Sequence, residues 1–476
     1  MGMMQRSVGA QLAEEGKDMR YISTRGETVP VDFVGASLGG VASDGGLYVP
    51  ERIPHFNRLK LDMLRGLTYP NLAVEVTAPF VAGSAMQLGQ YANIVRASYR
   101  SDVWECPEVA PLRHLGRKTH MLELFRGPTL AFKDLALQAV GPLLDAMLES
   151  RGEKRLFATS TSGDTGPAAI KAVAGRKNMD LVALFPDDGT SPFQRRQMTT
   201  ERAENIRCIA LRGTFDDCQR IVKRSGLPTF NSINWLRIQL QIPYYFKAYF
   251  DATKSNDEEV TFVVPTGNSG NIVAGWYAKQ MGLPIKRLIL ATNENSMLVE
   301  FVRSGVYRPR TVVKTTSPSQ DIGLSSNTER LVYHLCGDAK VVRQHYATLA
   351  REGAYRIDDG GRIQEAGIVA REATTAMRHR MMQLVHYQYD LDIDPHTANG
   401  FAVGLSYRDH DPIIFLATAS PVKFEETMLQ VLGYKPELPA RFAHIHELAE
   451  RVVTLDADDE AVLSYMRNFK QVLEPA

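Results

Sequence analysis

One lysine of this chain stands where its charge is out of place. Apolar residues at helical spacing follow Lys133 in the segment AFKDLALQAVGPLLDAMLE, so we predict that a helix starts near this residue. A helix start favours negative charge, and apolar neighbours such as Phe132 and Leu135 should further lower the pKa of a lysine there. A lysine that loses its proton can form a Schiff base with an aldehyde cofactor. Alternatively, Asp134 supplies the expected anion and Lys133 points to solvent.

Two loops combine glycines with polar side chains and are candidates for anion binding. The first follows the apolar run 155–159 and holds Thr161, Ser162, Gly163, Asp164 and Thr165. The second follows the run 260–264 and holds Gly267, Asn268, Ser269, Gly270 and Asn271. Main-chain N–H groups at the start of a helix bind phosphate or carboxylate groups. Both loops are also compatible with ordinary capped connections, and the second is neither a dinucleotide-binding nor a Walker A motif.

Three further segments carry polar groups that could contact a ligand. Thr418 ends the apolar run 412–417, where its hydroxyl could meet a ring nitrogen. A second segment holds Arg195 and Arg196. A third holds Ser325, Ser326, Asn327 and Arg330. Arginine binds phosphate through two parallel hydrogen bonds. Surface ion pairs with Glu201, Glu204 or Glu329 are the alternative for these arginines.

The elements that must position these residues alternate along the chain. Short runs rich in Val, Ile, Leu and Phe are separated by helical stretches, and they cover 121–125, 155–159, 181–185, 260–264, 287–292 and 412–417. This alternation predicts an α/β fold with a largely parallel sheet and helices on both faces. Ligands of such folds bind beyond the carboxyl ends of the strands, which is where the polar loops lie. We expect only helix and loop in 435–476.

Composition excludes several classes of protein. A length of 476 residues, at about 150 residues per domain, predicts two or three domains. The net charge of +1 gives no electrostatic case for binding nucleic acid or an anionic membrane. Four scattered cysteines and the absence of an HExxH motif argue against a disulfide scaffold and a metal site. Without an apolar signal segment, we expect a cytoplasmic enzyme of small molecules, either monomer or homodimer.

An ordered set of motifs resembles threonine synthase, in the longer form found in fungi and many bacteria. The motifs run from about residue 21 to 424 and include YISTRGE, SDGGLYVP, ELFRGPTLAFKD, ATSTSGDTG, LFPDDGTSPFQRRQMTT, NSINWLRIQLQIPYYF, VPTGNSGN, QDIGLSSNTERL, DPHTA and TASPVKF. The resemblance implies a pyridoxal 5′-phosphate (PLP) enzyme of fold type II, related to the tryptophan synthase β subunit. It also implies an N-terminal domain over 1–100, a large PLP-binding domain over 101–148 and 246–476, and a small substrate domain over 149–245.

The resemblance assigns roles to the candidate residues. Lys133 matches the Schiff-base lysine, the loop 267–271 matches the cofactor-phosphate loop, and Thr418 matches the partner of the pyridine nitrogen. The loop 161–165 matches the segment that receives the substrate carboxylate. The family's region for the substrate phosphate matches Arg195, Ser325, Ser326, Asn327 and Arg330.

The implied reaction converts O-phosphohomoserine and water to threonine and phosphate by γ-elimination and β-addition. Three alternatives stay open: a related phospho-lyase that releases 2-oxobutyrate, a paralogue acting on a related amino acid, and a non-catalytic protein on the same fold. Several residues depart from the family's usual motifs, and they are Pro167, Asp187, Asp188, Ser269, Thr328 and Ser420. Ser269 and Thr328 each stand where an aromatic residue is usual.

Overall fold

The computed structural model describes residues 18–357 and 361–468, and the larger of its sheets has six strands. Their order is β12 (Ile368–Glu372), β9 (Ile285–Thr292), β8 (Val260–Pro265), β13 (Ile413–Ala417), β4 (Thr119–Glu123) and β3 (Leu112–His114). Neighbouring strands run parallel except β3, which is antiparallel to β4. The predicted runs at 121–125, 260–264, 287–292 and 412–417 overlap β4, β8, β9 and β13, so the parallel sheet is confirmed.

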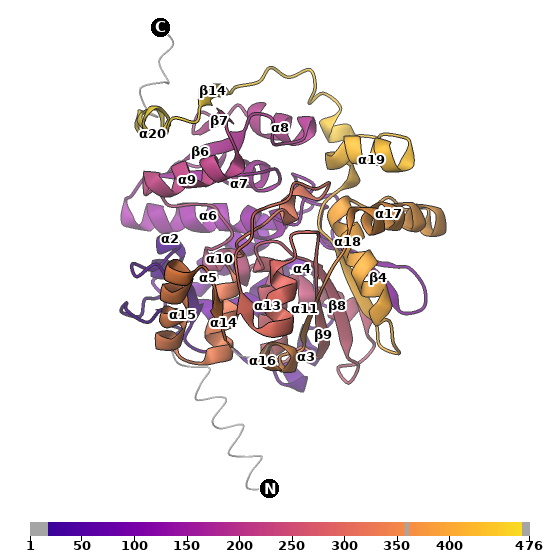
Figure 1. Ribbon diagram of the computed structural model, residues 1–476. Helices are drawn as coiled ribbons and strands as arrows, with labels where there is room; N and C mark the ends of the chain where they lie inside the picture. Colours follow the sequence, from indigo (N-terminus) through magenta and orange to yellow (C-terminus); the bar gives the residue numbers. More distant parts are fainter. Residues whose placement is uncertain (1–17, 358–360, 469–476) are drawn as a thin grey trace.

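The smaller sheet has four parallel strands among the described residues and lies in the upper part of Figure 1. Its order is β14 (Val453–Asp456), β7 (Ile206–Arg212), β6 (Met179–Pro186) and β5 (Arg155–Ser160). β5 and β6 were predicted as the runs 155–159 and 181–185. β7 and β12 were not predicted, because charged residues such as Arg207 and Arg371 interrupt their apolar runs.

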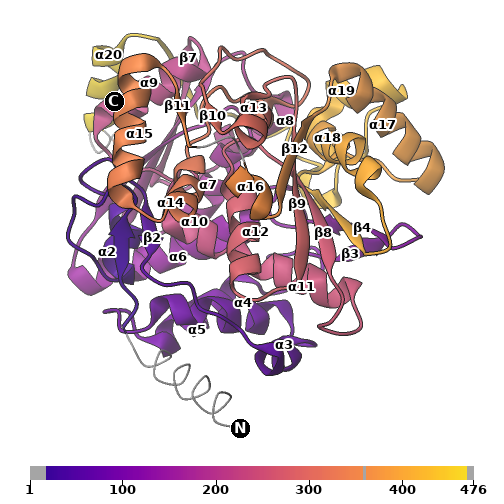
Figure 2. The same ribbon diagram turned by 60° about the horizontal axis from the view of Figure 1, so that its bottom comes forward.

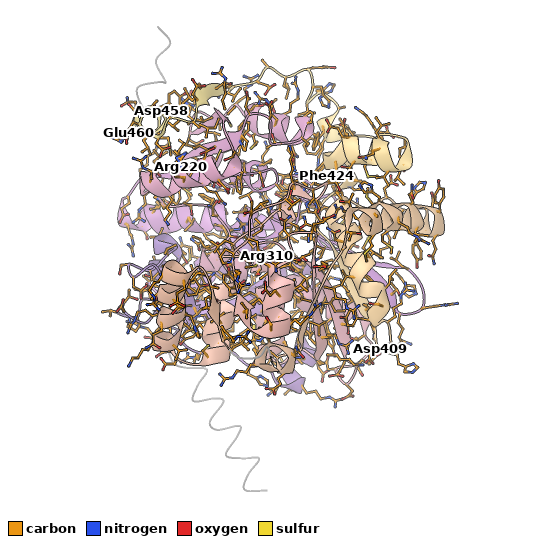
Figure 3. All side chains as sticks on the ribbon, viewed as in Figure 1. Arg220, Arg310, Asp409, Phe424, Asp458 and Glu460 are labelled. Atoms are coloured by element: carbon orange, nitrogen blue, oxygen red, sulfur yellow. The ribbon has the colours of Figure 1, made fainter. Side chains whose placement is uncertain are left out.

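The chain returns to the smaller sheet near its end. The expectation of only helix and loop in 435–476 is wrong, because β14 pairs with β7 from Val453 opposite Ile209 to Asp456 opposite Arg212. The helix α20 (Asp459–Arg467) then packs on α9 (Phe215–Ser225), where Asp459 pairs with both Arg220 and Arg224. Figure 3 labels Arg220 on α9 and, near it, Asp458 and Glu460 at the start of α20. A strand of four residues carries too little periodicity to be found in the sequence. The domain limits expected above stay a prediction.

Helices cover both faces of the larger sheet. Phe262 and Val264 of β8 belong to the largest hydrophobic cluster, while Val263 between them belongs to a second cluster. Side chains alternate between the faces of a strand, so this division reports burial on both sides. Figure 2 shows α17 (Thr375–Tyr389), α18 (Pro395–Gly404) and α19 (Glu425–Leu432) on one side of the sheet and α12 (Gly270–Gln280) on the other.

The largest cluster also reaches the smaller sheet and five further helices. These helices are α6 (Asp134–Arg151), α7 (Thr165–Val173), α8 (Pro192–Thr199), α10 (Trp235–Gln239) and α11 (Ile242–Ala252). α7 begins at Thr165 and α12 at Gly270, each at the end of one of the two predicted polar loops, and α6 begins directly after Lys133. A strand end and a helix start therefore meet at both loops, as expected. No helix in the described residues is long and apolar enough to cross a membrane.

The N-terminal part of the described chain packs against α14 (Thr328–Cys336). It contains β1 (Tyr21–Ser23), β2 (Tyr48–Pro50), α2 (Phe33–Gly39), α3 (Arg58–Leu64), α4 (Tyr69–Thr77) and α5 (Leu88–Ser98). Thr24 and Arg25 both hydrogen-bond the buried carboxylate of Glu329, at 2.6 and 3.0 Å. The remaining helices are α13 (Met297–Ser304), α15 (Ala339–Glu352) and α16 (Gly361–Glu365).

Candidate active site

The predicted polar loops meet in one cavity of about 620 Å³. Its walls come mainly from the loops that follow β4, β5, β8 and β13 and from the segment 309–326, with further residues from 215–219, from 231–241 and from His396. Of the predicted site residues, those in the wall are Lys133, Thr161, Ser162, Asp164, Thr165, Gly267, Asn268, Ser269, Gly270, Asn271, Ser326 and Thr418. The convergence follows from the two parallel sheets, which direct the carboxyl ends of their strands to a common region.

Lys133 lies in the cavity wall rather than in solvent. It immediately precedes α6, and 13% of its side chain is exposed. Burial lowers the pKa of Lys133 to about 8; the charges of Arg237 and Lys423 act in the same direction, while Asp164 opposes them. Asp134 does occupy the first turn of α6, where it accepts hydrogen bonds from the main chain and hydroxyl of Thr129. The solvent-facing alternative for Lys133 is therefore wrong.

Asp164 connects the two sides of the cavity. Its carboxylate lies 3.8 Å from Lys133 Nζ and 3.0 Å from Lys423 Nζ. It also accepts hydrogen bonds from Gln194 Nε2 at 3.0 Å and Ser319 Oγ at 3.3 Å. Burial alone would raise the pKa of Asp164, but the charges of Lys423 and Lys133 hold it well below its usual range. Asp164 is therefore a buried carboxylate that stays charged.

The loop 161–165 is shaped by one hydroxyl. Thr161 Oγ1 accepts hydrogen bonds from the main-chain N–H groups of Gly163 and Gly166, both at 3.0 Å. Thr161 therefore closes the loop at the start of α7. Gly163 does not line the cavity, whereas Ser162 and Thr165 do.

The loop 267–271 forms a cradle at the start of α12. Ser269 adopts the left-handed conformation, with φ of 58°. A Cβ atom at Gly267 would lie 2.6 Å from the main-chain oxygen of Ser319, so only glycine fits there. Asn271 Oδ1 accepts hydrogen bonds from the hydroxyls of Tyr244 and Tyr245, at 2.6 and 2.7 Å. Its Nδ2 is buried and has no hydrogen-bond partner among the described residues, so it is a donor available to a ligand.

Hydroxyl groups support this cradle from behind. Ser325 Oγ lies 2.7 Å from Ser269 Oγ and donates to the main-chain oxygen of Gly267 at 2.9 Å. Thr328 Oγ1 lies 3.2 Å from Ser269 Oγ. Asn327 Nδ2 donates to the main-chain oxygen of Asn268 at 3.0 Å. Ser325 and Asn327 therefore brace the cradle and do not line the cavity, unlike their neighbour Ser326.

Two arginines expected at a substrate phosphate lie elsewhere. Arg195 pairs with Asp187 at 2.7 Å and with Glu450 at 3.1 Å, and it does not line the cavity. Arg330 is fully buried and donates to the main-chain oxygens of Tyr48 and Ile233. Both guanidinium groups are thus engaged in holding distant segments together. The sequence did not reveal these partners, which are up to 282 residues away.

Other polar groups of the site were missed, although their motifs were recognised. Arg237 lines the cavity, and its buried Nε has no hydrogen-bond partner among the described residues. Burial lowers the pKa of Arg237 to about 10. His396 also lines the cavity; its Nδ1 lies 2.7 Å from Asp394 and its Nε2 accepts from the main chain of Ser319 at 3.0 Å. A lone cation in the apolar segment NWLRIQLQ was the available signal for Arg237.

Thr418 and Lys133 are held by adjoining segments. The main-chain oxygen of Thr418 accepts from Phe132 N at 2.8 Å, and Thr418 N donates to Thr397 Oγ1 at 3.2 Å.

Arg310, labelled in Figure 3, belongs to the segment between β10 (Val306–Tyr307) and η2 (Pro318–Gln320) and also lines the cavity.

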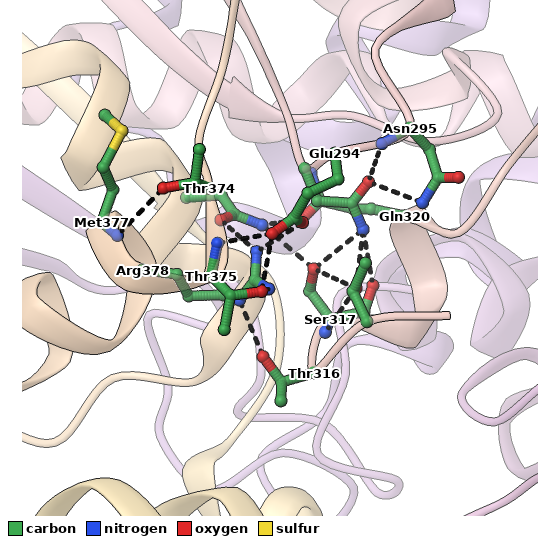
Figure 4. A network of polar contacts seen from close by, with 12 residues as sticks. Glu294, Asn295, Thr316, Ser317, Gln320, Thr374, Thr375, Met377 and Arg378 are labelled. Atoms are coloured by element: carbon green, nitrogen blue, oxygen red, sulfur yellow. Dashed lines mark hydrogen bonds and ion pairs between the residues drawn. The ribbon is translucent and has the colours of Figure 1, made fainter. Parts of the chain in front are cut away.

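A buried network fixes the cavity wall near η2 (Figure 4). Arg378 of α17 is fully buried and donates to Thr316 Oγ1 at 2.8 Å and Asn399 Oδ1 at 3.0 Å. Asn399 Nδ2 in turn donates to Ser317 Oγ at 3.1 Å and Gln320 Oε1 at 2.7 Å. The wall segment is thereby anchored to α17 and α18.

Three family models match successive parts of the chain. "Threonine synthase N terminus" matches residues 20–99, "Pyridoxal-phosphate dependent enzyme" matches 100–356, and "Threonine synthase, C-terminal" matches 397–466. The chain is 38% identical to threonine synthase of Methylobacillus glycogenes, over 94% of this chain and 99% of that protein. It is 41% identical to threonine synthase of Pseudomonas aeruginosa, over 92% and 96%. The crystal structure of PLP-bound threonine synthase from Brucella melitensis superposes with a TM-score of 0.90 and 38% identity, over 95% and 99% of the two chains.

Proposed function

The chain belongs to the threonine synthase family, whose members are PLP-dependent lyases of fold type II, and from this premise we propose that it converts O-phosphohomoserine and water to threonine and phosphate. The observation that carries the proposal is a buried amine, Lys133, in the same cavity as an anion cradle at 267–271. The alternative phospho-lyase activity is not favoured by the matches.

The residues of the cavity fit PLP. The cofactor phosphate would be held by the main-chain N–H groups at the start of α12 and by Asn271 Nδ2, which has no other partner in the described chain. Lys133 would hold the aldehyde carbon covalently, and the Thr418 hydroxyl would meet the ring nitrogen. When bound, PLP stores the electron pair that remains after a proton leaves the substrate Cα.

Proton transfer is assigned to Lys133. Because the pKa of Lys133 is about 8, part of the protein carries a neutral Lys133 amine near neutral pH. The neutral Nζ can accept the proton from the substrate Cα. We assign the substrate carboxylate to the loop 161–165, with Ser162 and Thr165 as its donors from the cavity wall. Asp164 beside them keeps its negative charge and orients Lys133 rather than the substrate.

Positive charge for the substrate phosphate is available on the cavity wall. The wall carries two arginines among the described residues, Arg237 and Arg310. Arg310 pairs with Glu300 at 2.6 Å, whereas Arg237 donates to the main-chain oxygen of Phe230 and keeps an unpartnered Nε. We therefore assign the phosphorylated end of the substrate to Arg237 in place of the expected Arg195 and Arg330. Cationic donors stabilise the charge that develops as phosphate leaves.

The proposal extends to the setting of the enzyme. A cytoplasmic location and a monomeric or homodimeric state are retained from the sequence as expectations. The near-zero net charge supports a partner that is a small molecule rather than nucleic acid or membrane.

The decisive experiment measures three products at once. Purified protein with PLP is incubated with O-phosphohomoserine, and phosphate, threonine and 2-oxobutyrate are quantified together, with Lys133→Ala as the control. Equal amounts of phosphate and threonine support the proposal. Phosphate with 2-oxobutyrate and no threonine favours the phospho-lyase, and no phosphate release by a protein that binds PLP overturns both.

A further inference from the structure

A buried ammonium group lies behind the cavity and has no part in the mechanism above. Lys423 belongs to η4 (Pro421–Phe424), and its side chain is 0% exposed. Its Nζ donates to Thr129 O at 2.8 Å, Gln197 Oε1 at 3.0 Å and Asp164 Oδ1 at 3.0 Å. An ammonium group has three protons, and these three acceptors use all of them. The Lys423 side chain is therefore held in place by three acceptors.

Stability alone does not explain this lysine. Removing a charge from water is costly, and well-packed apolar residues often replace a buried ion pair without loss. The geometry around Lys423 therefore has to show whether its charge acts on a neighbouring group. The nearest such group is Asp164, which Lys423 contacts and which also faces Lys133.

One carboxylate serves two ammonium groups here. Asp164 Oδ1 lies 3.0 Å from Lys423 Nζ, and its Oδ2 lies 3.8 Å from Lys133 Nζ. The contact of Asp164 with Lys423 is therefore the shorter one and is within hydrogen-bond distance, whereas the contact with Lys133 is longer. Asp164 thus neutralises the charge of Lys133 only in part. Without Lys423, the Asp164 charge would face Lys133 alone and would hold the proton on it.

The two lysines stand on segments that are fixed to each other. Ser420 N donates to Leu130 O at 3.0 Å, and Phe132 N donates to Thr418 O at 2.8 Å. The segment before Lys133 and the segment before Lys423 are thereby joined by main-chain hydrogen bonds. These bonds fix the backbone at Lys133 relative to the backbone near Lys423.

We propose that Lys423 is a positioning residue that engages the Asp164 carboxylate and so leaves Lys133 able to release its proton. This inference rests on the proposed role of Lys133. The direction of charge effects supports it, since Lys423 lowers the pKa of Lys133 and Asp164 raises it. The other charged or titratable groups around these three residues are Arg237, His396 and Asp134.

The test measures the protonation of Lys133 directly. The full-length protein, freed of PLP, is acetylated with trace acetic anhydride between pH 6 and pH 10, and mass spectrometry quantifies label on the Lys133 peptide. We expect a midpoint near pH 8 in the wild type. Lys423→Met should raise this midpoint by about one pH unit or more, and Asp164→Asn should lower it. Lys435→Met, an exposed lysine paired with Glu425, is the matched control and should not shift it.

Opposite shifts separate this role from a merely structural one. Loss of packing would expose Lys133 and raise its midpoint in both variants, because burial is what lowers the pKa most. Lys423→Gln serves as a second variant where the methionine variant does not fold. An unchanged midpoint in a folded Lys423 variant, or a raised midpoint in Asp164→Asn, overturns the proposal. Since the labelling needs neither PLP nor substrate, a protein that makes no threonine but shows the opposite shifts refutes only the proposed function.

Discussion

Thr328 Oγ1 lies 3.2 Å from Ser269 Oγ, so two residues that depart from the usual motifs of the threonine synthase family are in direct contact. Ser325 Oγ lies 2.7 Å from the same Ser269 hydroxyl. The resemblance implies an aromatic residue at both positions, and both hold a small hydroxyl residue here. Because the two side chains touch behind the cradle at 267–271, we treat them as one coupled change.

The coupling predicts a non-additive effect on PLP binding. Ser269→Ala and Thr328→Ala each remove a hydrogen bond worth about 1 kcal/mol, which corresponds to a several-fold weaker Kd for PLP. The double variant should lose less than the sum, since both substitutions break the same contact. Titration of the PLP-free protein, followed by absorbance, measures each Kd. Ser406→Ala, which removes a remote serine hydroxyl on η3 (Leu405–Tyr407), is the control, and strict additivity would argue against the coupling.

Lys133 predicts a pH-dependent attachment of PLP. Only a neutral amine attacks an aldehyde, and the pKa of about 8 means that lowering the pH below 8 protonates the Lys133 side chain. The rate of appearance of the absorbance band of attached PLP should therefore rise with pH and level off above about 8. Lys133→Ala should show no band and should lose about 10³-fold or more in activity. A band of normal intensity in that variant would contradict the assignment.

Substitutions of Arg237 and of Arg195 should have clearly different effects on the kinetic constants. Arg237→Met should raise KM for O-phosphohomoserine by about tenfold or more, because it removes a cation from the cavity wall. Arg195→Met should leave kcat/KM within about twofold, since its ion pairs with Asp187 and Glu450 lie outside the cavity and are only partly buried. The reverse pattern would restore the original expectation for Arg195.

The sequence predicted the site better than it predicted the partners of its residues. A helix start after Lys133 and polar turns with glycine at 161–165 and 267–271 are local features, and local features are visible in one stretch of sequence. The parallel arrangement of strands then brings them to one cavity. The general rule that ligands bind beyond strand ends was sufficient for this step.

Contacts between distant segments could not be predicted in the same way. The main-chain acceptors of Arg330 and the ion pair between Arg195 and Glu450 join segments more than 90 residues apart. The strand β14 is too short to show a pattern. Lys423 was read only as part of a motif, because nothing in its neighbours indicates that its charge is buried against Asp164.

The raised pKa of Asp134 predicts an unusual dependence of the free energy of unfolding on pH. Burial raises the pKa of Asp134 to about 6, although hydrogen bonds from Thr129 oppose this. Between pH 4 and pH 6 the folded chain then holds a proton on Asp134 that the unfolded chain has lost. The free energy of unfolding contributed by this group therefore increases as the pH falls through 6, and it decreases as the pH rises.

A variant isolates this contribution from that of other groups. Asp134→Asn cannot titrate, so the difference in unfolding free energy between wild type and variant should change by up to about 3 kcal/mol in favour of wild type from pH 7 to pH 4. Urea unfolding followed by circular dichroism at several pH values measures it. Asp188→Asn, at an exposed aspartate, is the control for the loss of one carboxylate. A constant difference for Asp134→Asn would contradict the raised pKa of Asp134. It would mean that Lys133, directly before α6, stands next to a carboxylate that is ionised over most of this pH range.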